Sequence, residues 1–177
     1  YCGNTLESLT TMAHAQLREG DDGELGILED PLGPLWYRGL AGAAPAARRD
    51  TVNAILERHG ARRIVIGHSV SNGVIWPRLD GRVIQIDTGM SRAYGGHVGW
   101  LVIEDGQLVA GYRDGQVPLP ADDAGRLDYL DAVIALQPGN QALVERRGAL
   151  VSGVLELAQA QADGKPADPA AICGTSR

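Results

Sequence analysis

The sequence predicts a mixed α/β (α+β) domain in which a central strand is followed by β-hairpins and flanked by helices. A short β-branched run at 64–66 ends abruptly in a glycine and a histidine. Two Asp-Gly pairs, at 80–81 and 105–106, each separate two apolar runs, as tight hairpin turns do. Apolar residues recur at helical spacing before and after these strands. Strand and helix patterns do not alternate regularly, so a simple βαβ repeat is not expected.

Two helices are predicted ahead of the first strand. The first covers residues 5–19, and Thr5 can cap its amino end. Its apolar stripe consists of Leu6, Leu9, Ala13 and Leu17. The second covers about 46–58, and its apolar side consists of Val52, Ile55 and Leu56. Between them, the stretch 29–39 contains two prolines and two glycines, which predicts irregular structure.

The strands are predicted from apolar runs and turns. Residues 64–66 are continuously apolar, which indicates a strand buried on both faces. One hairpin is expected to pair 74–79 with 82–87, and another to pair 97–104 with 107–112. Pro77 cannot donate a hydrogen bond to a sheet, so its strand should lie at an edge or carry a bulge.

The composition shifts near residue 120, where helical patterns return at 122–136 and 141–161. The last residues, rich in proline and small side chains, indicate a loose tail. We therefore expect a main α/β part at 1–119, a helical extension at 120–162 and a flexible tail at 163–177.

Composition limits the classes of partner. The 177 residues carry a net charge of -6, with a pI near 5.1, which argues against a nucleic-acid binder because such proteins need a basic face. No apolar run approaches the ~20 residues that span a bilayer, so no membrane partner is expected. The chain begins with Tyr1, which indicates a fragment or a processed chain. A disulfide between Cys2 and Cys173 is possible and leaves both cytoplasm and periplasm open.

The most informative segment for chemistry is Gly67-His68. A histidine at the carboxyl end of a buried strand lies where open α/β sheets place their active sites. The glycine allows a sharp turn, and neutral imidazole is a common ligand for Zn, Fe or Mn. His68 is therefore either a metal ligand or a strand-ending histidine that hydrogen-bonds a neighbouring loop. The residues of this segment leave both interpretations open.

A serine-hydrolase interpretation fits nearly the same letters. Residues 67–71 come close to the nucleophile elbow G-x-S-x-G, with Ser69 as nucleophile. Asp87 and His97 follow in the order that this fold uses. However, Ser71 replaces the last glycine, a hairpin is expected where the elbow needs a helix, and the intervals are short. An α/β-hydrolase-like serine esterase remains the alternative.

Several ordered segments favour the metal-ligand interpretation. Residues 30–39 read Asp-Pro-Leu-Gly-Pro-Leu-Trp-Tyr-Arg-Gly. This stretch resembles the D-P-x-G-P-L-W-Y-R-G segment of bacterial phosphatases in the calcineurin-like metallophosphoesterase superfamily, Shewanella-like protein phosphatase branch. As in that family, a helix, the strand with Gly67-His68, a hairpin and an I-D-T-G-M segment at 86–90 follow in order. The resemblance covers about residues 1–115.

The resemblance implies the carboxy-terminal half of a four-layer αββα sandwich with added C-terminal helices. It also implies hydrolysis of phosphomonoesters, including phosphoproteins, at a centre of two divalent metals (Mn, Fe or Zn). His68 matches a histidine that ligates one of these metals. Tyr37 and Arg38 match a segment on the substrate side, and we expect the fork of Arg38 to contact the phosphate. The structural alternative for Arg38 is an ion pair with Glu29.

Three other residues of these segments have simpler interpretations. Trp36 is expected to pack in the core. Asp87 should cap the turn at 88–89 rather than orient a site, and Tyr94 either flanks the cleft or packs against the domain.

The earlier metal-ligand motifs of this family are D-x-H, G-D-x-x-D-R-G, G-N-H-E and a later H-G-G. None occurs in the 177 residues. The chain therefore supplies at most one metal ligand of the family's set, and we expect it to be inactive in isolation. A non-catalytic interaction module that kept the fold is the third possibility.

Overall fold

The computed structural model describes residues 4–20, 26–42 and 45–153. The chain divides into two compact units, and residues 4–20 and 26–39 belong to the first. Residues 40–42 and 45–153 belong to the second. The expected tail at 163–177, the last turns of the helix expected at 141–161 and both cysteines lie outside the described residues.

The first unit contains helix α1, Leu6–Glu19, whose position confirms the predicted helix. Thr5 caps it in a capping box, because its hydroxyl accepts from the Ser8 amide while Ser8 accepts from the Thr5 amide. No residue of α1 is buried, and Leu6 and Leu17 of the predicted apolar stripe are both exposed. Periodicity located the helix correctly, but the stripe buries no side chain of α1.

Irregular structure at residues 29–38 is also confirmed. The segment forms turns: the Asp30 carboxylate accepts from the Leu32 amide at 2.8 Å, and the Gly33 amide donates to the Asp30 carbonyl at 2.8 Å. The stretch ends at the short helix α2, Gly39–Gly42.

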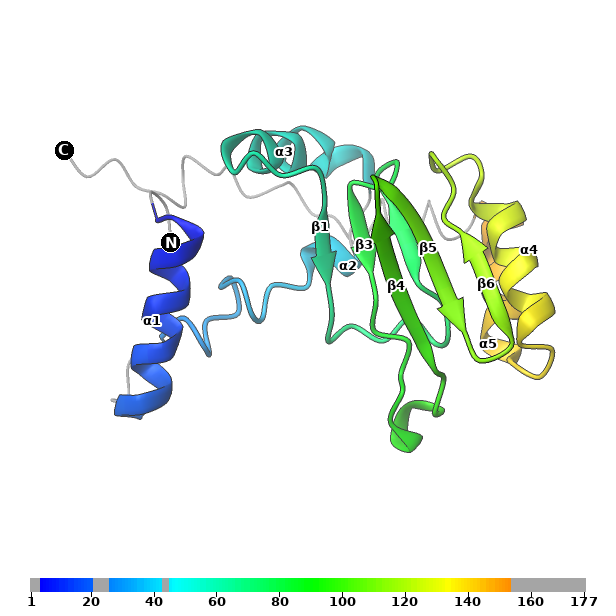
Figure 1. The fold of residues 1–177 in the computed structure, drawn as a ribbon, viewed down its shortest axis with the longest axis horizontal. Helices are drawn as coiled ribbons and strands as arrows, with labels where there is room; N and C mark the ends of the chain where they lie inside the picture. The colour runs from blue at the N-terminus through cyan, green and yellow to red at the C-terminus, as the bar shows by residue number, and fades with distance from the viewer. Residues whose placement is uncertain (1–3, 21–25, 43–44, 154–177) are drawn as a thin grey trace. The chain divides into compact units, whose positions relative to one another are not determined.

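The second unit contains a three-stranded sheet in the order β1-β3-β2 (Figure 1). Strand β1 is Ile64–Ile66, β2 is Trp76–Arg78 and β3 is Val83–Gln85. Strands β2 and β3 pair antiparallel, as the first hairpin prediction requires, and β2 is an edge strand, as Pro77 indicates. Strand β1 runs parallel to β3 at the other edge.

The expectation that residues 64–66 form a strand buried on both faces is wrong. Val65 in the middle of β1 is 43% exposed, because Ile64 and Ile66 face the core under α3 while Val65 points to the opposite face of this edge strand. Helix α3, Pro45–Arg58, packs Val52 and Leu56 against Leu79 and Val83. Ile55, expected on the same apolar side, is exposed, since it points away from this small core.

A second antiparallel sheet follows in the order β4-β5-β6. Its strands are β4, Gly99–Glu104, β5, Gln107–Tyr112, and β6, Gly115–Pro118. Glu104 pairs with Gln107, so Asp105-Gly106 forms a two-residue turn and the second hairpin is confirmed. Strand β6 was not predicted. A short 3-10 helix, Arg92–Tyr94, precedes this sheet.

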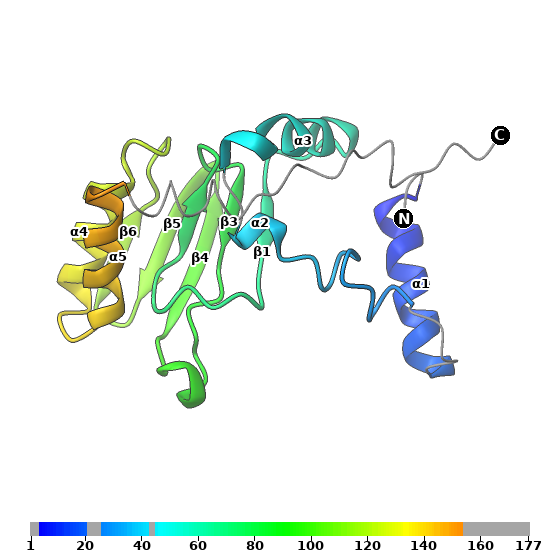
Figure 2. The same ribbon diagram turned by 180° about the vertical axis from the view of Figure 1, so that it is seen from behind.

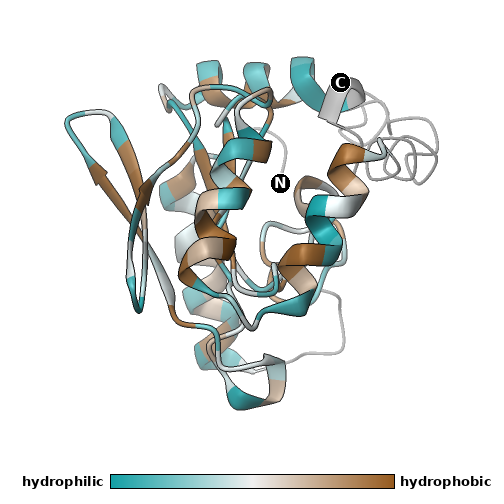
Figure 3. Ribbon diagram, turned by 90° about the vertical axis from the view of Figure 1, so that its right-hand side faces the viewer, coloured by the Kyte–Doolittle hydropathy of each residue, from teal (hydrophilic) through white to brown (hydrophobic). Residues whose placement is uncertain are grey.

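Helices α4, Arg126–Leu136, and α5, Gln141–Val151, lie side by side next to β6 (Figures 1 and 2). Both carry polar and apolar residues (Figure 3). Their buried side chains join one core with residues from β2, β3 and β5, which includes Trp76, Ile84, Tyr112, Leu130 and Leu143. Residues 126–151 are therefore packed into the second unit. No described helix is long and apolar enough to cross a bilayer.

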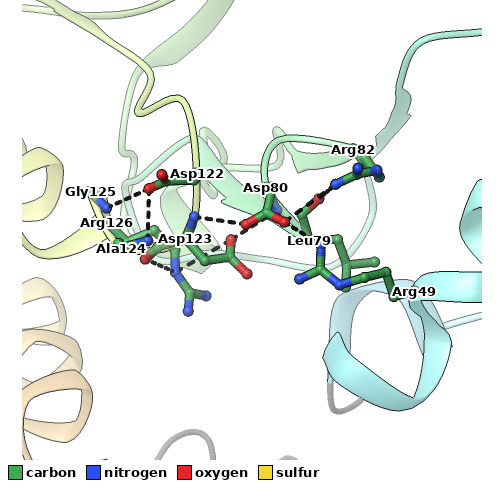
Figure 4. A network of polar contacts seen from close by, with 9 residues as sticks. All are labelled: Arg49, Leu79, Asp80, Arg82, Asp122, Asp123, Ala124, Gly125 and Arg126. Atoms are coloured by element: carbon green, nitrogen blue, oxygen red, sulfur yellow. Dashed lines mark hydrogen bonds and ion pairs between the residues drawn. The ribbon is translucent and has the colours of Figure 1, made fainter.

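A polar network fastens the β2–β3 turn to the segment that enters α4 (Figure 4). The Asp80 carboxylate accepts from Arg49 and from Arg82, while Asp80 and Asp123 each accept from the other's backbone amide at 3.2 Å. The hydrogen bond from Arg49, helped by the Asp123 amide, holds the pKa of Asp80 below its usual range.

Candidate functional site

His68 lies where the sequence places it, directly after β1. It adopts a left-handed backbone conformation, with φ of 57°, and its side chain is exposed. The parallel neighbour β3 ends at the same edge of the sheet, where Asp87 follows. The Ile86 amide donates to the Ile66 carbonyl at 2.9 Å and extends the pairing to this edge. His68 and Asp87 thus follow the carboxyl ends of adjacent parallel strands, which is the usual position of a ligand site.

Asp87 caps a turn, as predicted. Its Oδ1 accepts from the Gly89 amide at 3.0 Å. The next residue, Thr88, is buried and donates its hydroxyl to the His97 carbonyl at 2.7 Å. These bonds order the backbone after β3 and account for one of the two carboxylate oxygens.

The segment 67–75, called here the His68 loop, connects β1 to β2 without regular structure. Strand β3 and the residues after it hold its first half. The Gln85 amide donates to the Ser69 carbonyl at 2.6 Å, and the Ser71 amide donates to the Asp87 carbonyl at 2.7 Å. The Ser71 hydroxyl lies within hydrogen-bonding distance of the carbonyls of Val74 and Asp87.

Side chains from beyond residue 136 hold the middle of the His68 loop. Asn140 donates to the Asn72 carbonyl at 2.9 Å, and Gln137 donates to the Gly73 carbonyl at 2.7 Å. Arg146 donates to the Ser71 carbonyl at 3.3 Å while its guanidinium lies 5.0 Å from the Trp76 ring. Burial lowers the pKa of Arg146, because desolvation disfavours its charged form.

Two buried tyrosines hold the end of the loop. The Tyr129 hydroxyl donates to the Ile75 carbonyl at 2.7 Å, and the Ile75 amide donates to the Tyr112 hydroxyl at 3.1 Å. The two hydroxyls are 2.7 Å apart. Since the single proton of Tyr129 goes to Ile75, Tyr112 is the donor between them. Burial raises the pKa of both phenols, so both stay neutral donors at physiological pH.

A cavity of about 260 Å³ adjoins this region. Its lining includes His97, Arg113, Gln137 and Asn140. His97 is half-buried, with Nδ1 3.4 Å from the Asn140 amide nitrogen. The residues that hold the loop were not predicted from the sequence. A glutamine inside the apolar run of β3 was the one available signal.

Residues 67–75 do not form the nucleophile elbow that the serine-hydrolase interpretation needs. Residues 69–75 are not helical and lead into β2, whereas a nucleophile elbow turns directly into a helix. The Ser69 carbonyl is held by Gln85, Asp87 caps its own turn, and His97 contacts Asn140. The local geometry predicted for a Ser69 nucleophile is therefore wrong.

Tyr37 and Arg38 belong to the first unit and His68 to the second. Arg38 donates to the Leu35 carbonyl at 3.0 Å, and its guanidinium lies 5.2 Å from the Trp36 ring. Neither contact is the alternative ion pair with Glu29. Trp36 is 47% exposed, so the expectation of core packing is wrong; its ring instead lies under Arg38. Tyr94 is exposed as well.

The described residues do not complete a metal centre by themselves. Across residues 4–20, 26–42 and 45–153, no group of three or more His, Cys, Asp or Glu side chains could hold a metal ion.

Comparison with known proteins adds a fold relationship. No protein-family model matches the chain. An uncharacterized protein of Schizosaccharomyces pombe is 36% identical over 64 residues, which cover 36% of this chain and 19% of that protein. Among solved structures, a cold-active protein tyrosine phosphatase is similar with a TM-score of 0.54 and 23% identity, over 68% of this chain and 37% of that one. The chain thus spans well under half the length of either protein, and it shares the fold of part of a phosphatase.

Proposed function

We propose that this chain is the carboxy-terminal part of a metal-dependent phosphoesterase of the calcineurin-like type, which hydrolyses phosphomonoesters, including phosphoproteins. The observation that carries the proposal is the position of His68. It is exposed, left-handed and placed after a parallel strand, in a fold similar to that of a phosphatase. In this proposal the two sheets and their helices are half of a four-layer αββα sandwich.

The proposal gives separate roles to three side chains. His68 contributes one ligand to a centre of two divalent metals (Mn, Fe or Zn), whose other ligands lie outside the described residues. Such a centre neutralises phosphate oxygens and supplies an activated water. Arg38 binds phosphate oxygens with its planar guanidinium, which the Trp36 ring helps to orient, and Tyr37 lies beside it in the sequence.

The test uses the full polypeptide that the gene encodes, because the chain spans only 37% of the similar phosphatase chain. His68→Ala should lower metal-dependent hydrolysis of p-nitrophenyl phosphate by more than about 100-fold, since even residues behind metal ligands contribute about 10–100-fold. Arg38→Lys should raise KM more than it lowers kcat, because the bidentate fork is lost. His14→Ala, an exposed residue of α1, is the matched control.

Four results would count against the proposal. Full activity of the His68→Ala variant would remove His68 from the metal centre. Metal-dependent turnover by residues 1–177 alone would contradict the single-ligand interpretation, since one histidine cannot hold two metals. Labelling of Ser69 by a fluorophosphonate would revive the serine-esterase alternative. A full-length protein that lacks the family's other ligand motifs would favour the non-catalytic module.

A further inference from the structure

Three side-chain amides converge on the backbone of the His68 loop from two directions. Gln85 reaches the Ser69 carbonyl from β3, at 2.6 Å. Asn140 and Gln137, from the turn between α4 and α5, reach the carbonyls of Asn72 and Gly73 at 2.9 and 2.7 Å. We call these three residues the amide clamp. Each of these three bonds to the loop runs from a side-chain nitrogen to a backbone oxygen.

Burial makes these bonds selective for one loop conformation. Gln85 is 6% exposed and Asn140 is 9% exposed, so neither side chain has water as an easy substitute partner. A buried amide without a partner is unfavourable, and so is a buried carbonyl. The three carbonyls belong to no sheet ladder, since residues 69–73 are not in a strand. If the loop moved away, each buried side-chain amide and each loop carbonyl would therefore lose its hydrogen-bond partner.

The clamp surrounds two unusual backbone conformations. His68 and Asn72 have φ of 57° and 59°, in the left-handed region that non-glycine residues adopt infrequently. Gly73, with φ of 102°, leaves no space for a side chain: an added Cβ would lie 2.3 Å from the Asn140 amide nitrogen. Side-chain donors that bind the backbone of Ser69 and Asn72 favour these left-handed conformations.

We propose that the amide clamp positions His68, so that Gln85, Gln137 and Asn140 act as positioning residues for the candidate site. What His68 does once positioned rests on the proposed function. The segment beyond residue 120 then helps to hold the His68 loop, because the α4–α5 turn supplies two of the three donors. Gln85 acts closest to His68, on the carbonyl of the adjoining residue.

The test is NMR spectroscopy of the 177-residue chain, with the Cα and Cβ shifts of His68 as the report of its backbone conformation. Gln85→Leu keeps most of the side-chain volume and removes the donor. The double variant Gln137→Glu/Asn140→Asp keeps both shapes and presents acceptors to the carbonyls. Gln116→Glu, an exposed amide on β6, is the matched control. The β4–β5 hairpin signals report whether the second unit stays folded.

We expect both clamp variants to move the His68 shifts away from left-handed values and to speed amide exchange at residues 69–73 at least about tenfold, a change typical of local opening. The hairpin signals and the control should stay unchanged. Unaltered His68 shifts in both variants would overturn the inference. If Gln85→Leu loses the hairpin signals as well, the double variant decides alone.

A separate measurement distinguishes this inference from the proposed function. Zn²⁺ is titrated into the full polypeptide that the gene encodes, because the proposed function places the other metal ligands outside the described residues, and the His68 ring signals are followed with His14 as internal reference. Selective perturbation of His68 supports its role as a ligand. Absence of any response counts against the proposed function and leaves the conformational result for the amide clamp intact.

Discussion

The His68 loop and the turn between β4 and β5 stabilise left-handed backbone conformations by different contacts. Both contain left-handed residues: His68, Asn72 and Gly73 in the loop, and Asp105 and Gly106 in the turn. In the turn, the backbone ladder of β4 and β5 continues to the pair Glu104–Gln107, so the two central residues are bounded by strand pairing. In the loop, hydrogen-bond partners come from β3, β5, α4, α5 and the turn between the helices.

The difference shows which residues determine each backbone conformation. The turn is specified within a few residues, because Asp-Gly favours the left-handed pair that a two-residue hairpin needs. The loop is specified by residues up to 75 positions away, as for Arg146 and Ser71. We expect mutations in the turn to act locally, and mutations in the loop to act through the helices.

The sharpest test places the same change in both regions, beginning with Gly73→Ala. The added Cβ would lie 2.3 Å from the Asn140 amide nitrogen and 2.9 Å from the Gln137 amide oxygen, at a left-handed φ. Strain and overpacking together should lower the free energy of unfolding by about 2–4 kcal/mol. Urea denaturation measures this value. A loss no larger than that of the turn variant described below would contradict the comparison.

A smaller effect is expected from Tyr129→Phe, which removes the hydroxyl that donates to the Ile75 carbonyl. The carbonyl and the Tyr112 hydroxyl each lose a partner in the core, so the free energy of unfolding should fall by about 1–3 kcal/mol. Tyr94→Phe, at an exposed ring, is the control and should change little. Equal effects of the two variants in urea denaturation would mean that the buried bonds add no stability.

Gly106→Ala is the matched change in the turn. The Cβ would meet only the Arg62 guanidinium at 3.7 Å, which is ordinary contact. Left-handed strain alone remains, so the free energy of unfolding should fall by about 1–2 kcal/mol. Amide exchange should accelerate in β4 and β5 and stay unchanged at residues 69–73. Faster exchange in the loop would show that the two regions are coupled.

The smallest effect is expected at the β2–β3 turn, where Asp80 joins Arg49, Arg82 and Asp123. The pKa of Asp80 is lowered in the folded state, so its stabilisation is present above the ordinary value of 3.8 and is lost as pH falls through the folded pKa. Asp80→Asn should lower the free energy of unfolding by about 0.5–1 kcal/mol at neutral pH, because the ion pairs are partly exposed.

Urea denaturation of wild type and Asp80→Asn checks this pH dependence, over a range from about pH 2 to about pH 7 that includes the ordinary carboxylate pKa. The difference between wild type and Asp80→Asn should shrink below the usual carboxylate range. Asp114→Asn, an exposed carboxylate on the β5–β6 turn, is the control. A difference that stays constant with pH would mean that the charge of Asp80 is not the source of the effect.

Much of the local structure could be predicted. Helix α1 and its Thr5 cap, the two hairpins, the edge position of Pro77 and the turn cap of Asp87 all depend on neighbouring residues. Strand β6 was missed although Asp114-Gly115 repeats the Asp-Gly signal, since its four residues form no clear apolar run. These outcomes follow from contacts that span few residues.

Burial was predicted less well, because it depends on what packs against each element. Val65 is apolar but lies in an edge strand, and Trp36 is large but lies under Arg38 at the surface. The residues around the candidate site were missed for the same reason. Gln137 and Asn140 follow a helix in the sequence, and nothing near them indicates that their partners are Gly73 and Asn72.

The sequence by itself determined that His68 follows a strand and a glycine, and that hairpins follow in turn. Periodicity, turn residues and hydrogen-bond caps depend on residues close together in the chain, so they can be predicted from the sequence. Only the tertiary structure decided how the His68 loop is held, because its hydrogen-bond partners come from β3, β5, α5 and the turn before α5, which the chain brings together on folding. A loop without its own ladder takes its conformation from the surfaces that surround it.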